Sequence, residues 1–503
     1  MLVTFVLVVT AIVTALYAYS RYHHNYWSAR GVPTAPNLLP FLGHLHTQIF
    51  CGKKARWEHA DEAYYHGGSR LCGFYEQFKP VLMIGDPDIV KAVLIKDFDH
   101  FINRRETKMM SKRDKIFNGI LTVLTGDEWK GVRSLLSPIF TSGKMKGMFR
   151  LVEHKAEELN AYILREMKAN SKIKIRKAFG LYSLEVISSC AFGMETNTLA
   201  DDGNSIFNQK VQAMSKISTG RLLKFLFFMM CPKLCQALQI NLTVPETEFF
   251  KEVVEEAMRS RENQQHKRGD FLDLMMEARK DHNNPNANTN KYTITDQVVV
   301  SNSILFILAG FDTTANTLCF VAHMLAQNPE EQQRLRQELR DIIKDHGELT
   351  YQSLLEAKFL DAVMNETLRL HPTAIFTERQ CTKDYTIPGT NVTVRAKDMI
   401  MIPTWSIQRD EKYWPQPTKF RPDRFLPENK DQIRSGTFLP FGLGPRNCIG
   451  MRFALMEAKL ALAKMVLNFE LSCEPGKEEM ELDTSIGLMK TTEDCSLIFT
   501  PLE

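Results

Sequence analysis

The stretch "FGLGPRNCIG", Phe441–Gly450, places one cysteine and one arginine among three glycines and a proline. A disulfide bridge requires no such setting, so three other roles remain for Cys448: a zinc ligand, a nucleophile, or the single protein ligand of an iron cofactor. Zinc sites need three or four clustered ligands, and a nucleophilic cysteine needs a histidine base. The sequence places neither beside Cys448, so an iron cofactor fits this stretch better than the alternatives.

The residues around Cys448 suit a flat iron cofactor. Gly444 permits a tight turn before the cysteine, and Gly450 lets the backbone pass close beneath a planar group. The next run, "MRFALMEAKLALAKMV", predicts a helix that begins near Gly450 and directs its positive N-terminal dipole toward the sulfur. These features favour a thiolate. A thiolate bound to haem iron donates electron density that favours cleavage of an O–O bond.

The whole chain has the composition of a large folded protein. It has 503 residues, 44% of them hydrophobic, and a net charge of only +4. This balance gives no reason to expect nucleic acid as a partner. No long linker divides the sequence, so we expect one large domain. The ten cysteines include no C-x-x-C pair, which argues against a structural zinc site.

The N-terminal run is apolar and carries no charge up to Tyr19. It is long enough to approach the hydrocarbon thickness of a bilayer and predicts a membrane anchor. A cleaved signal peptide is the alternative, but a basic n-region and a clean cleavage site are missing. Arg21 and Arg30 follow the run, so the positive-inside rule leaves the rest of the chain in the cytosol. The expected divisions are a transmembrane signal-anchor at 1–20, a basic and proline-rich hinge at 21–45, and the main domain at 46–503.

Most of the main domain shows helical periodicity, with few strand signals. Apolar residues recur at helical spacing in Leu151–Ala169, Asn328–Asp345 and Leu354–Leu370. The best strand patterns are Phe78–Asp86 and Asn391–Pro403. The sequence therefore predicts a mainly α protein with small β-sheets.

The longest helix pattern is Gln297–Gln327, which would extend roughly 45 Å at about 1.5 Å per residue. Its polar residues would be costly against lipid, so we expect it to cross the protein core. In its middle, "AGFDTT" places Gly310, which leaves room for a bulky group, near Asp312 and Thr313. The acid could supply a proton, and the hydroxyl could bond back to a carbonyl. A buried polar group satisfied by its neighbours is an equally good interpretation of these residues alone.

Together these motifs resemble those of one family. "FGLGPRNCIG" is similar to the haem-binding signature of the cytochrome P-450 family. The residues in register are Phe441, Gly444, Arg446, Cys448 and Gly450. "AGFDTT" resembles the oxygen-activation segment, "ETLR" the Glu-x-x-Arg pair, and "FRPDRF" the segment before the haem loop. The resemblance covers essentially the whole chain and is closest to the microsomal type, in the animal drug- and steroid-oxidising branch. It implies the cytochrome P-450 fold, as one large domain behind an N-terminal transmembrane helix.

The resemblance implies roles for individual residues. Cys448 would be the axial thiolate ligand of haem b, and Asp312 and Thr313 would deliver protons during oxygen activation. The other loop residues expected to bind the haem are Phe441, Gly444, Arg446 and Gly450.

The "ETLR" motif has a simpler interpretation as well. Glu366 and Arg369 lie three residues apart and could be a solvated helical pair worth a few tenths of a kcal/mol. The family resemblance instead implies that they meet Arg424 of "FRPDRF" in a buried triad that supports the haem loop.

Four further residues are expected to reach the haem propionates together with Arg446. Trp129 and Arg133 of "WKGVR" could form a plain cation–π pair, but the resemblance implies contacts to a propionate. Likeness to the animal branch adds Arg104 of "FINRRE" and Arg379 of "TERQC". Arginine suits this task because its guanidinium pairs bidentately with a carboxylate.

The resemblance implies a haem-thiolate monooxygenase that inserts one atom of dioxygen into a lipophilic substrate of xenobiotic, steroid or fatty-acid type. The chain has no flavin or nicotinamide fingerprint, so electrons must come from another protein. NADPH-cytochrome P-450 reductase is the implied donor, with cytochrome b5 as a further candidate. The implied location is the endoplasmic reticulum membrane, single-pass, with the domain facing the cytosol. The alternatives are a haem-thiolate isomerase or dehydratase without a reductase, and a non-catalytic haem-binding protein.

Three further sets of residues bear on substrate and partner. The apolar stretch "LLKFLFFMMCP", Leu222–Pro232, is either a core helix or a segment that dips into the bilayer near the substrate entrance. The pocket residues implied by the family are Ile304–Ala309, Thr373–Thr377 and Ile486–Met489. A basic group near Trp129 is either a reductase docking patch or a solvated face. It consists of Lys130, Lys144, Lys146 and Arg150.

Overall fold

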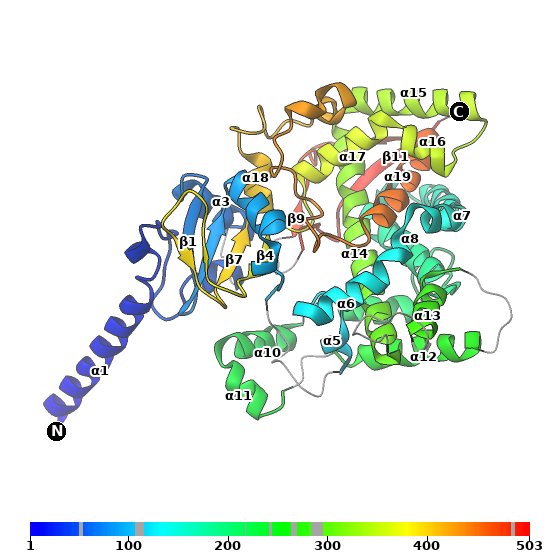
Figure 1. Ribbon diagram of the computed structural model, residues 1–503. Coiled ribbons are helices and arrows are strands. Elements are labelled where there is room, and N and C mark those ends of the chain that lie inside the picture. The colour runs from blue at the N-terminus through cyan, green and yellow to red at the C-terminus, as the bar shows by residue number, and fades with distance from the viewer. Residues whose placement is uncertain are drawn as a thin grey trace.

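The computed structural model describes residues 1–49, 54–105, 115–216, 218–240, 244–262, 269–282, 295–483 and 488–502. A large helical body adjoins a smaller region built on a β-sheet, from which the first helix projects (Figure 1). The helices are α1 (Leu2–His23), α2 (Leu45–Ile49), α3 (Arg56–His66), α4 (Pro87–Lys91), α5 (Lys115–Gly119), α6 (Gly126–Leu136), α7 (Ser142–Met167), α8 (Ile175–Phe192), α9 (Ile206–Ser215), α10 (Thr219–Met230), α11 (Pro232–Ala237), α12 (Glu246–Glu262), α13 (Phe271–His282), α14 (Asp296–Gln327), α15 (Pro329–His346), α16 (Tyr351–Glu356), α17 (Lys358–Leu370), α18 (Thr404–Arg409) and α19 (Met451–Asn468). The expectation of a mainly α protein with small sheets is confirmed.

The strands are β1 (Leu71–Glu76), β2 (Lys79–Ile84), β3 (Lys172–Lys174), β4 (Thr377–Gln380), β5 (Tyr385–Thr386), β6 (Thr393–Val394), β7 (Met399–Ile402), β8 (Phe469–Ser472), β9 (Leu482–Asp483), β10 (Lys490–Thr491) and β11 (Ser496–Pro501). The main sheet has the order β1-β2-β7-β4, with β2 and β7 parallel and the other pairs antiparallel. Strand β7, "MIMI", is buried at every position, as an inner strand requires. The pairing of β7 with β2 thereby joins β7 and β4 to strands from far earlier in the chain.

Helix α14 crosses the helical body (Figure 1). It is apolar and long enough to span a bilayer, but 67% of its most apolar window is buried inside the protein. It packs against α8, α19 and α17. The expectation that this helix crosses the protein core is therefore confirmed.

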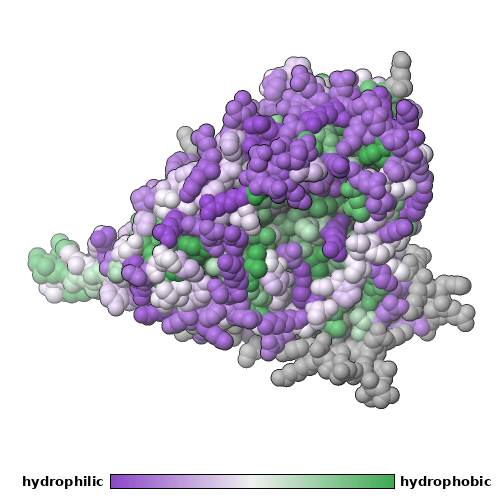
Figure 2. Space-filling view, turned by 45° about the horizontal axis from the view of Figure 1, so that its top comes forward, coloured by the Kyte–Doolittle hydropathy of each residue, from purple (hydrophilic) through white to green (hydrophobic). Residues whose placement is uncertain are grey.

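Helix α1 is the opposite case, because its apolar window is not buried at all. Figure 2 shows it as a hydrophobic projection from a surface that is otherwise mostly hydrophilic. An exposed apolar helix of 22 residues is consistent with a membrane anchor. The helix continues to His23, past the predicted end at residue 20.

The segment after α1 is docked on the main sheet. Trp27 is completely buried, and a Cβ atom added at Gly73 of β1 would overlap its side chain. The backbone N–H of Trp27 donates to the hydroxyl of Tyr75, and Gly73 donates to the carbonyl of Pro33. The chain forms no helix at residues 31–44, where Pro33, Pro36 and Pro40 disfavour one.

Two predicted elements are divided in the structure. The helix expected over Leu354–Leu370 is broken at Ala357 into α16 and α17. The side chain of Glu338 on α15 accepts hydrogen bonds from the N–H groups of Phe359 and Leu360, and so caps α17 from outside the segment. The strand expected over Asn391–Pro403 becomes β6 and β7, which belong to different sheets.

Candidate active site

The cysteine loop is held tightly against the short π-helical turn at Ala92–Lys96. Gly444 has a φ of 73°, and a Cβ atom there would overlap the carbonyl oxygen of Leu94. Only glycine fits that position, as the sequence predicts. The backbone N–H of Cys448 donates to the carbonyl of Phe441 at 2.9 Å, which closes the loop. Helix α19 starts directly afterwards, with Gly450 as its N-cap.

Cys448 lies deep in the protein, yet its side chain is exposed because it faces an internal cavity. Burial raises the pKa of its thiol, whereas a backbone hydrogen bond from Gly450 and the charges of Arg133 and Arg104 lower it. The sulfur is directed at the cavity, whose lining includes Cys448.

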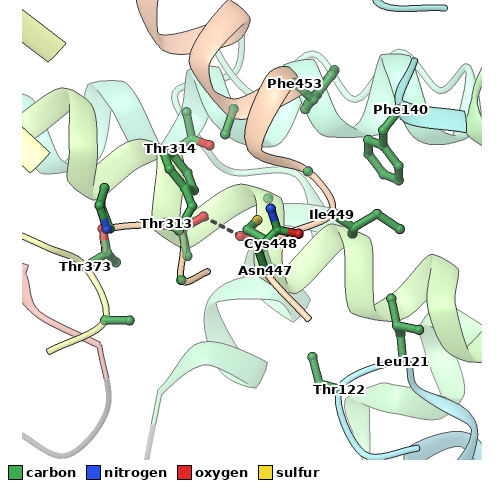
Figure 3. Close-up of a pocket in the computed structure, with 18 of the residues that line it drawn as sticks. Leu121, Thr122, Phe140, Thr313, Thr314, Thr373, Asn447, Cys448, Ile449 and Phe453 are labelled. Carbon is green, nitrogen blue, oxygen red and sulfur yellow. Dashed lines mark hydrogen bonds between the residues drawn. The ribbon is translucent and has the colours of Figure 1, made fainter. Parts of the chain in front are cut away.

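The cavity has a volume of about 350 Å³ and lies between α14 and the cysteine loop. Figure 3 shows side chains gathered around Cys448, with Thr313 and Thr314 on α14. The other walls come from the loop before α6, from β4 and from the start of α19. The apolar lining includes Leu121, Phe140, Leu305, Phe306, Ala309 and Phe453. Apolar walls around one cysteine and a few polar groups are typical of a cofactor and ligand site.

Four arginines also line the cavity: Arg104, Arg133, Arg379 and Arg446. None of them forms an ion pair with a carboxylate in the part of the chain that the structure describes. Burial, together with the neighbouring arginines, lowers the pKa of Arg379 and Arg446 to about 9. Arg379 Nε has no hydrogen-bond partner. Buried cations without counter-ions indicate that this end of the cavity is built for an anionic group.

These features fit a haem. Its two carboxylates would neutralise the arginine cluster, and its iron would accept the cysteine sulfur. A Cβ atom at Gly450 would meet only Phe140, at 3.9 Å, so the protein itself does not require glycine there. The open side of Gly450 borders the cavity, where a flat group would need the space. Within the described residues there is no cluster of three His, Cys, Asp or Glu that could hold a metal ion instead.

The structure separates the alternatives for Trp129. The guanidinium of Arg446, not that of Arg133, lies over its ring, with Cζ 4.7 Å from the ring centroid. Arg133 instead donates to the backbone and side-chain oxygens of Asn447, both at 3.0 Å. The plain cation–π pair between Trp129 and Arg133 is therefore not formed. Both residues border the cavity, and their contact with a propionate stays a prediction.

The residues of "AGFDTT" point in different directions. Thr313 lines the cavity, and its hydroxyl donates to the carbonyl of Ala309 at 2.6 Å, as the sequence predicts. Asp312 does not line the cavity, because its carboxylate pairs with Arg176 on α8. A Cβ at Gly310 would be 3.0 Å from Ile187, so this glycine also serves the close packing of α14 on α8. The structure thus brings Thr313 to Cys448 and keeps Asp312 away from the cavity.

The predicted triad is formed. Arg369 Nε donates to Glu366 at 2.7 Å, and Arg424 Nε lies 3.3 Å from the same carboxylate. The side chains of Glu366 and Arg369 are completely buried. Arg369 also donates to the carbonyls of Gln408 and Pro417, which ties the triad to the chain that precedes the cysteine loop.

Three residues near the cavity were missed by the sequence interpretation: Thr314, Arg176 and Glu457. Thr314 lines the cavity beside Thr313, and Arg176 holds Asp312. Glu457 is a fully buried acid on α19. A signal for Glu457 existed, because α19 is apolar on nearly every side, and an acid in such a helix must be buried.

Comparison with known proteins identifies the family. The family model described as Cytochrome P450 matches residues 33–499. The chain belongs to the cytochrome P450 family. It is 35% identical to Cytochrome P450 9e2 of Blattella germanica, over 92% of this chain and 91% of that protein. It is also 35% identical to Cytochrome P450 3A29 of Sus scrofa, over 97% and 93%, and 36% identical to Cytochrome P450 3A9 of Rattus norvegicus, over 94% and 92%.

Membership of the cytochrome P450 family has direct consequences for the chemistry. The protein carries a haem iron with a cysteine thiolate as axial ligand, and it is an oxidoreductase of the monooxygenase type. It requires a redox partner and a small-molecule substrate. The relatives agree with the animal drug- and steroid-oxidising branch indicated by the sequence motifs.

Proposed function

We propose that this cytochrome P450 is a microsomal monooxygenase that oxidises lipophilic small molecules, with Cys448 as the iron ligand. The observation that carries the proposal is a single cysteine that faces an apolar cavity. The edge of this cavity holds four arginines that have no carboxylate partner among the described residues. The haem, when bound, supplies reductive activation of dioxygen. The chain supplies the thiolate, charge neutralisation, exclusion of water and protons.

Each group of residues has a separate task in this proposal. Arg104, Arg379 and Arg446 hold the haem carboxylates, and Arg133 links the cluster to the loop through Asn447. The triad around Glu366 keeps the segment before the cysteine loop in place. Thr313 lines the same cavity as Cys448, and its hydroxyl would pass on the protons that the reaction requires.

The lining supports a lipophilic substrate. The predicted pocket segments contribute Leu305, Phe306, Thr373, Ala374 and Leu488 to the cavity. Among the expected positions, 486 and 487 lie outside the described residues. Few charged groups other than the arginine cluster face the cavity, so binding would depend mainly on apolar surface. The proposed substrates are lipophilic molecules of xenobiotic, steroid or fatty-acid type.

We also propose a place in the endoplasmic reticulum membrane, with the main domain in the cytosol. Besides α1, the helices α10 and α11 expose Leu223 and Leu234, and Leu238 is exposed directly after α11. Exposed apolar side chains on two neighbouring helices suit contact with lipid. The orientation predicts that the exposed sequon at Asn391 carries no glycan. A mobility shift on glycosidase treatment, absent from an Asn391→Gln variant, would contradict it.

The proposed electron donor is NADPH-cytochrome P-450 reductase, with cytochrome b5 as a further partner. The candidate docking patch is only partly available, because Lys130 pairs with Asp99 and Arg150 pairs with Glu348. Lys144 and Lys146 are exposed on α7, and the described residues provide no acidic partner for either. These two lysines are the better candidates for a docking contact.

The carbon monoxide difference spectrum of the reduced protein tests the ligand. The wild-type protein should give the thiolate band, and Cys448→Ser should lose it. An imidazole-type band in the wild-type protein would remove the assignment. Reconstitution with reductase and dioxygen then tests the reaction: product that forms without either one would favour a haem-thiolate isomerase or dehydratase.

A further inference from the structure

Gln408 on α18 is a completely buried amide that joins two distant parts of the chain. Its Nε2 donates to the carbonyl oxygens of Leu368 and Arg369 at 3.0 and 2.9 Å. Its Oε1 accepts the backbone N–H of Leu439 at 2.7 Å. Leu368 and Arg369 lie at the end of α17, and Leu439 lies just before the cysteine loop. One side chain thus connects a helix end with the start of the loop that carries Cys448.

The helix end holds Gln408 in two ways. The last carbonyl groups of a helix have no partner within the helix, and the amide of Gln408 caps two of them on α17. The guanidinium of Arg369 donates in return to the backbone carbonyl of Gln408 at 2.8 Å, while it also pairs with Glu366. The backbone and the side chain of Gln408 are therefore both fixed by the helix that carries the buried triad.

The bond to Leu439 fixes the start of the loop. The carbonyl of Leu439 accepts the N–H of Gly442 at 2.9 Å, and the carbonyl of Phe441 accepts the N–H of Cys448 at 2.9 Å. Leu439, Phe441 and Cys448 all line the cavity. Two backbone hydrogen bonds within one short loop thus lie between Leu439 and Cys448, so a shift of Leu439 moves the sulfur relative to the cavity.

Gln332 on α15 forms nearly the same set of bonds at another place in the protein. It is also buried, its Nε2 donates to the carbonyls of Leu325 and Leu471 at 3.2 and 2.9 Å, and its Oε1 accepts the N–H of Leu471 at 2.8 Å. Arg336 donates a further bond to it at 3.1 Å. Gln332 joins the end of α14 to β8, and its two partners lie outside the cavity lining. Gln408 and Gln332 are thus matched in chemistry, but Gln408 ends at the cysteine loop.

We infer that Gln408 is a positioning residue for the iron ligand, which holds the start of the cysteine loop at a fixed place on the end of α17. Arg369 reaches the backbone of the segment before the loop, whereas the side chain of Gln408 reaches the loop itself. The inference rests on the proposed function, because it concerns the sulfur of Cys448 as a haem ligand. It predicts that Gln408 determines how firmly the thiolate stays on the iron, beyond its contribution to the stability of the fold.

The persistence of the thiolate-bound form tests the inference. Gln408→Met and Gln332→Met each replace a buried amide by an apolar side chain of similar length, so both should lower the urea midpoint of the haem-loaded protein. At a urea concentration at which circular dichroism shows both variants folded, the thiolate carbon monoxide band should decay about three- to tenfold faster in Gln408→Met than in Gln332→Met. This is the effect expected from one hydrogen bond lost at the loop. Equal decay rates in the two variants would overturn the inference.

Hydrogen exchange measures the contact itself, without any need for activity. The amide of Leu439 should exchange faster in Gln408→Met than in wild type, whereas Gln332→Met should leave Leu439 unchanged and speed the exchange of Leu471. Unchanged exchange at Leu439 in Gln408→Met would contradict the inference. If Gln408→Met does not fold, the same two comparisons are made between the milder pair Gln408→Asn and Gln332→Asn, whose shorter amides cannot reach both of their partners.

The two levels of proposal fail in different ways. A wild-type protein without a thiolate carbon monoxide band, or without reductase-dependent oxygen uptake, would refute the proposed function. A wild-type protein that passes both tests, while Gln408→Met keeps its thiolate band as long as Gln332→Met does, would refute only the role of Gln408.

Discussion

Two clusters of buried arginines in this protein differ in one respect. Arg369 and Arg424 meet Glu366, a partner supplied by the chain itself. The arginines that line the cavity meet no carboxylate among the described residues, and burial lowers the pKa of Arg379 and Arg446 to about 9. Both clusters are shielded from water, so burial alone does not explain the difference.

The difference distinguishes arginines that stabilise the fold from arginines that bind a ligand. Where the chain provides both signs, the pair is satisfied on folding and holds segments together, as Arg369 does for the carbonyls of Gln408 and Pro417. Where the chain provides only cations, the second sign must come from a ligand. The haem carboxylates are that ligand in our proposal, and the comparison can be tested by removing charges from each cluster.

The largest effect should come from the paired cluster. Glu366→Ala leaves two guanidinium groups without a counter-charge, and breaking a buried pair in this way costs about 3–5 kcal/mol. We expect a lower urea midpoint and little or no haem incorporation, read from the carbon monoxide spectrum. Glu338→Ala, which removes the cap of α17 but no buried ion pair, is the control and should cost only about 1 kcal/mol. Wild-type haem content in Glu366→Ala would show that the triad does not support the loop.

Glu457 extends the same comparison to a buried acid that forms no ion pair with a cation among the described residues. Its pKa is raised to about 8 in the folded protein, above the ordinary glutamate value of 4.5, so between these pH values the folded state binds more protons than the unfolded state. Its contribution to stability is therefore fully present below about pH 4.5 and is lost as the pH rises toward 8. The free energy of unfolding of wild type should fall relative to Glu457→Gln by a few kcal/mol over this range, at about 1.4 kcal/mol per pKa unit. Parallel pH profiles would mean that Glu457 is already ionised at pH 5.

These cases mark what the sequence can predict. The cysteine loop could be predicted from Gly444 and Cys448, because a turn that requires glycine and a single sulfur ligand both show in the local sequence. Helix α14 follows from its apolar periodicity. The orientation of Asp312 does not follow, because it depends on Arg176, which is brought near by the packing of α8.

Other features could not be predicted from the sequence for the same reason. The break at Ala357 depends on Glu338, which caps α17 from α15 and leaves no trace in the local pattern. Thr314 ends the "AGFDTT" motif and Glu457 lies in the apolar α19, but their proximity depends on the packing of α14 against α19. Local chemistry can therefore be read from the chain, while contacts between distant elements require the fold.

A third prediction concerns the unpaired cluster, where one substitution should have opposite effects on the haem-free and the haem-loaded protein. Arg379→Met removes a buried cation whose one hydrogen-bond acceptor among the described residues is the carbonyl of Glu378. Without haem, the variant should be as stable as wild type or more stable, since uncompensated charge is lost. With haem, it loses a charged hydrogen bond worth about 1.5–3 kcal/mol, so haem should leave faster. Urea midpoints of the haem-free forms and rates of haem transfer to an excess of a scavenging haem protein measure the two effects. Destabilisation of the haem-free form would contradict the binding role.

The smallest effect is expected at Trp129, whose ring lies under the guanidinium of Arg446. A cation–π contact that is shielded from water contributes about 1–2 kcal/mol, and phenylalanine provides a weaker one. Trp129→Phe should therefore speed haem transfer only a few-fold, because Arg446 keeps its bonds to the carbonyls of Ile102 and Leu124. A double-mutant cycle sharpens the result: Trp129→Phe should couple with Arg446→Met and be additive with Arg133→Met. Coupling with Arg133 instead would mean that the haem-loaded cluster differs from the one described, and that Trp129 changes its arginine partner when the carboxylates bind.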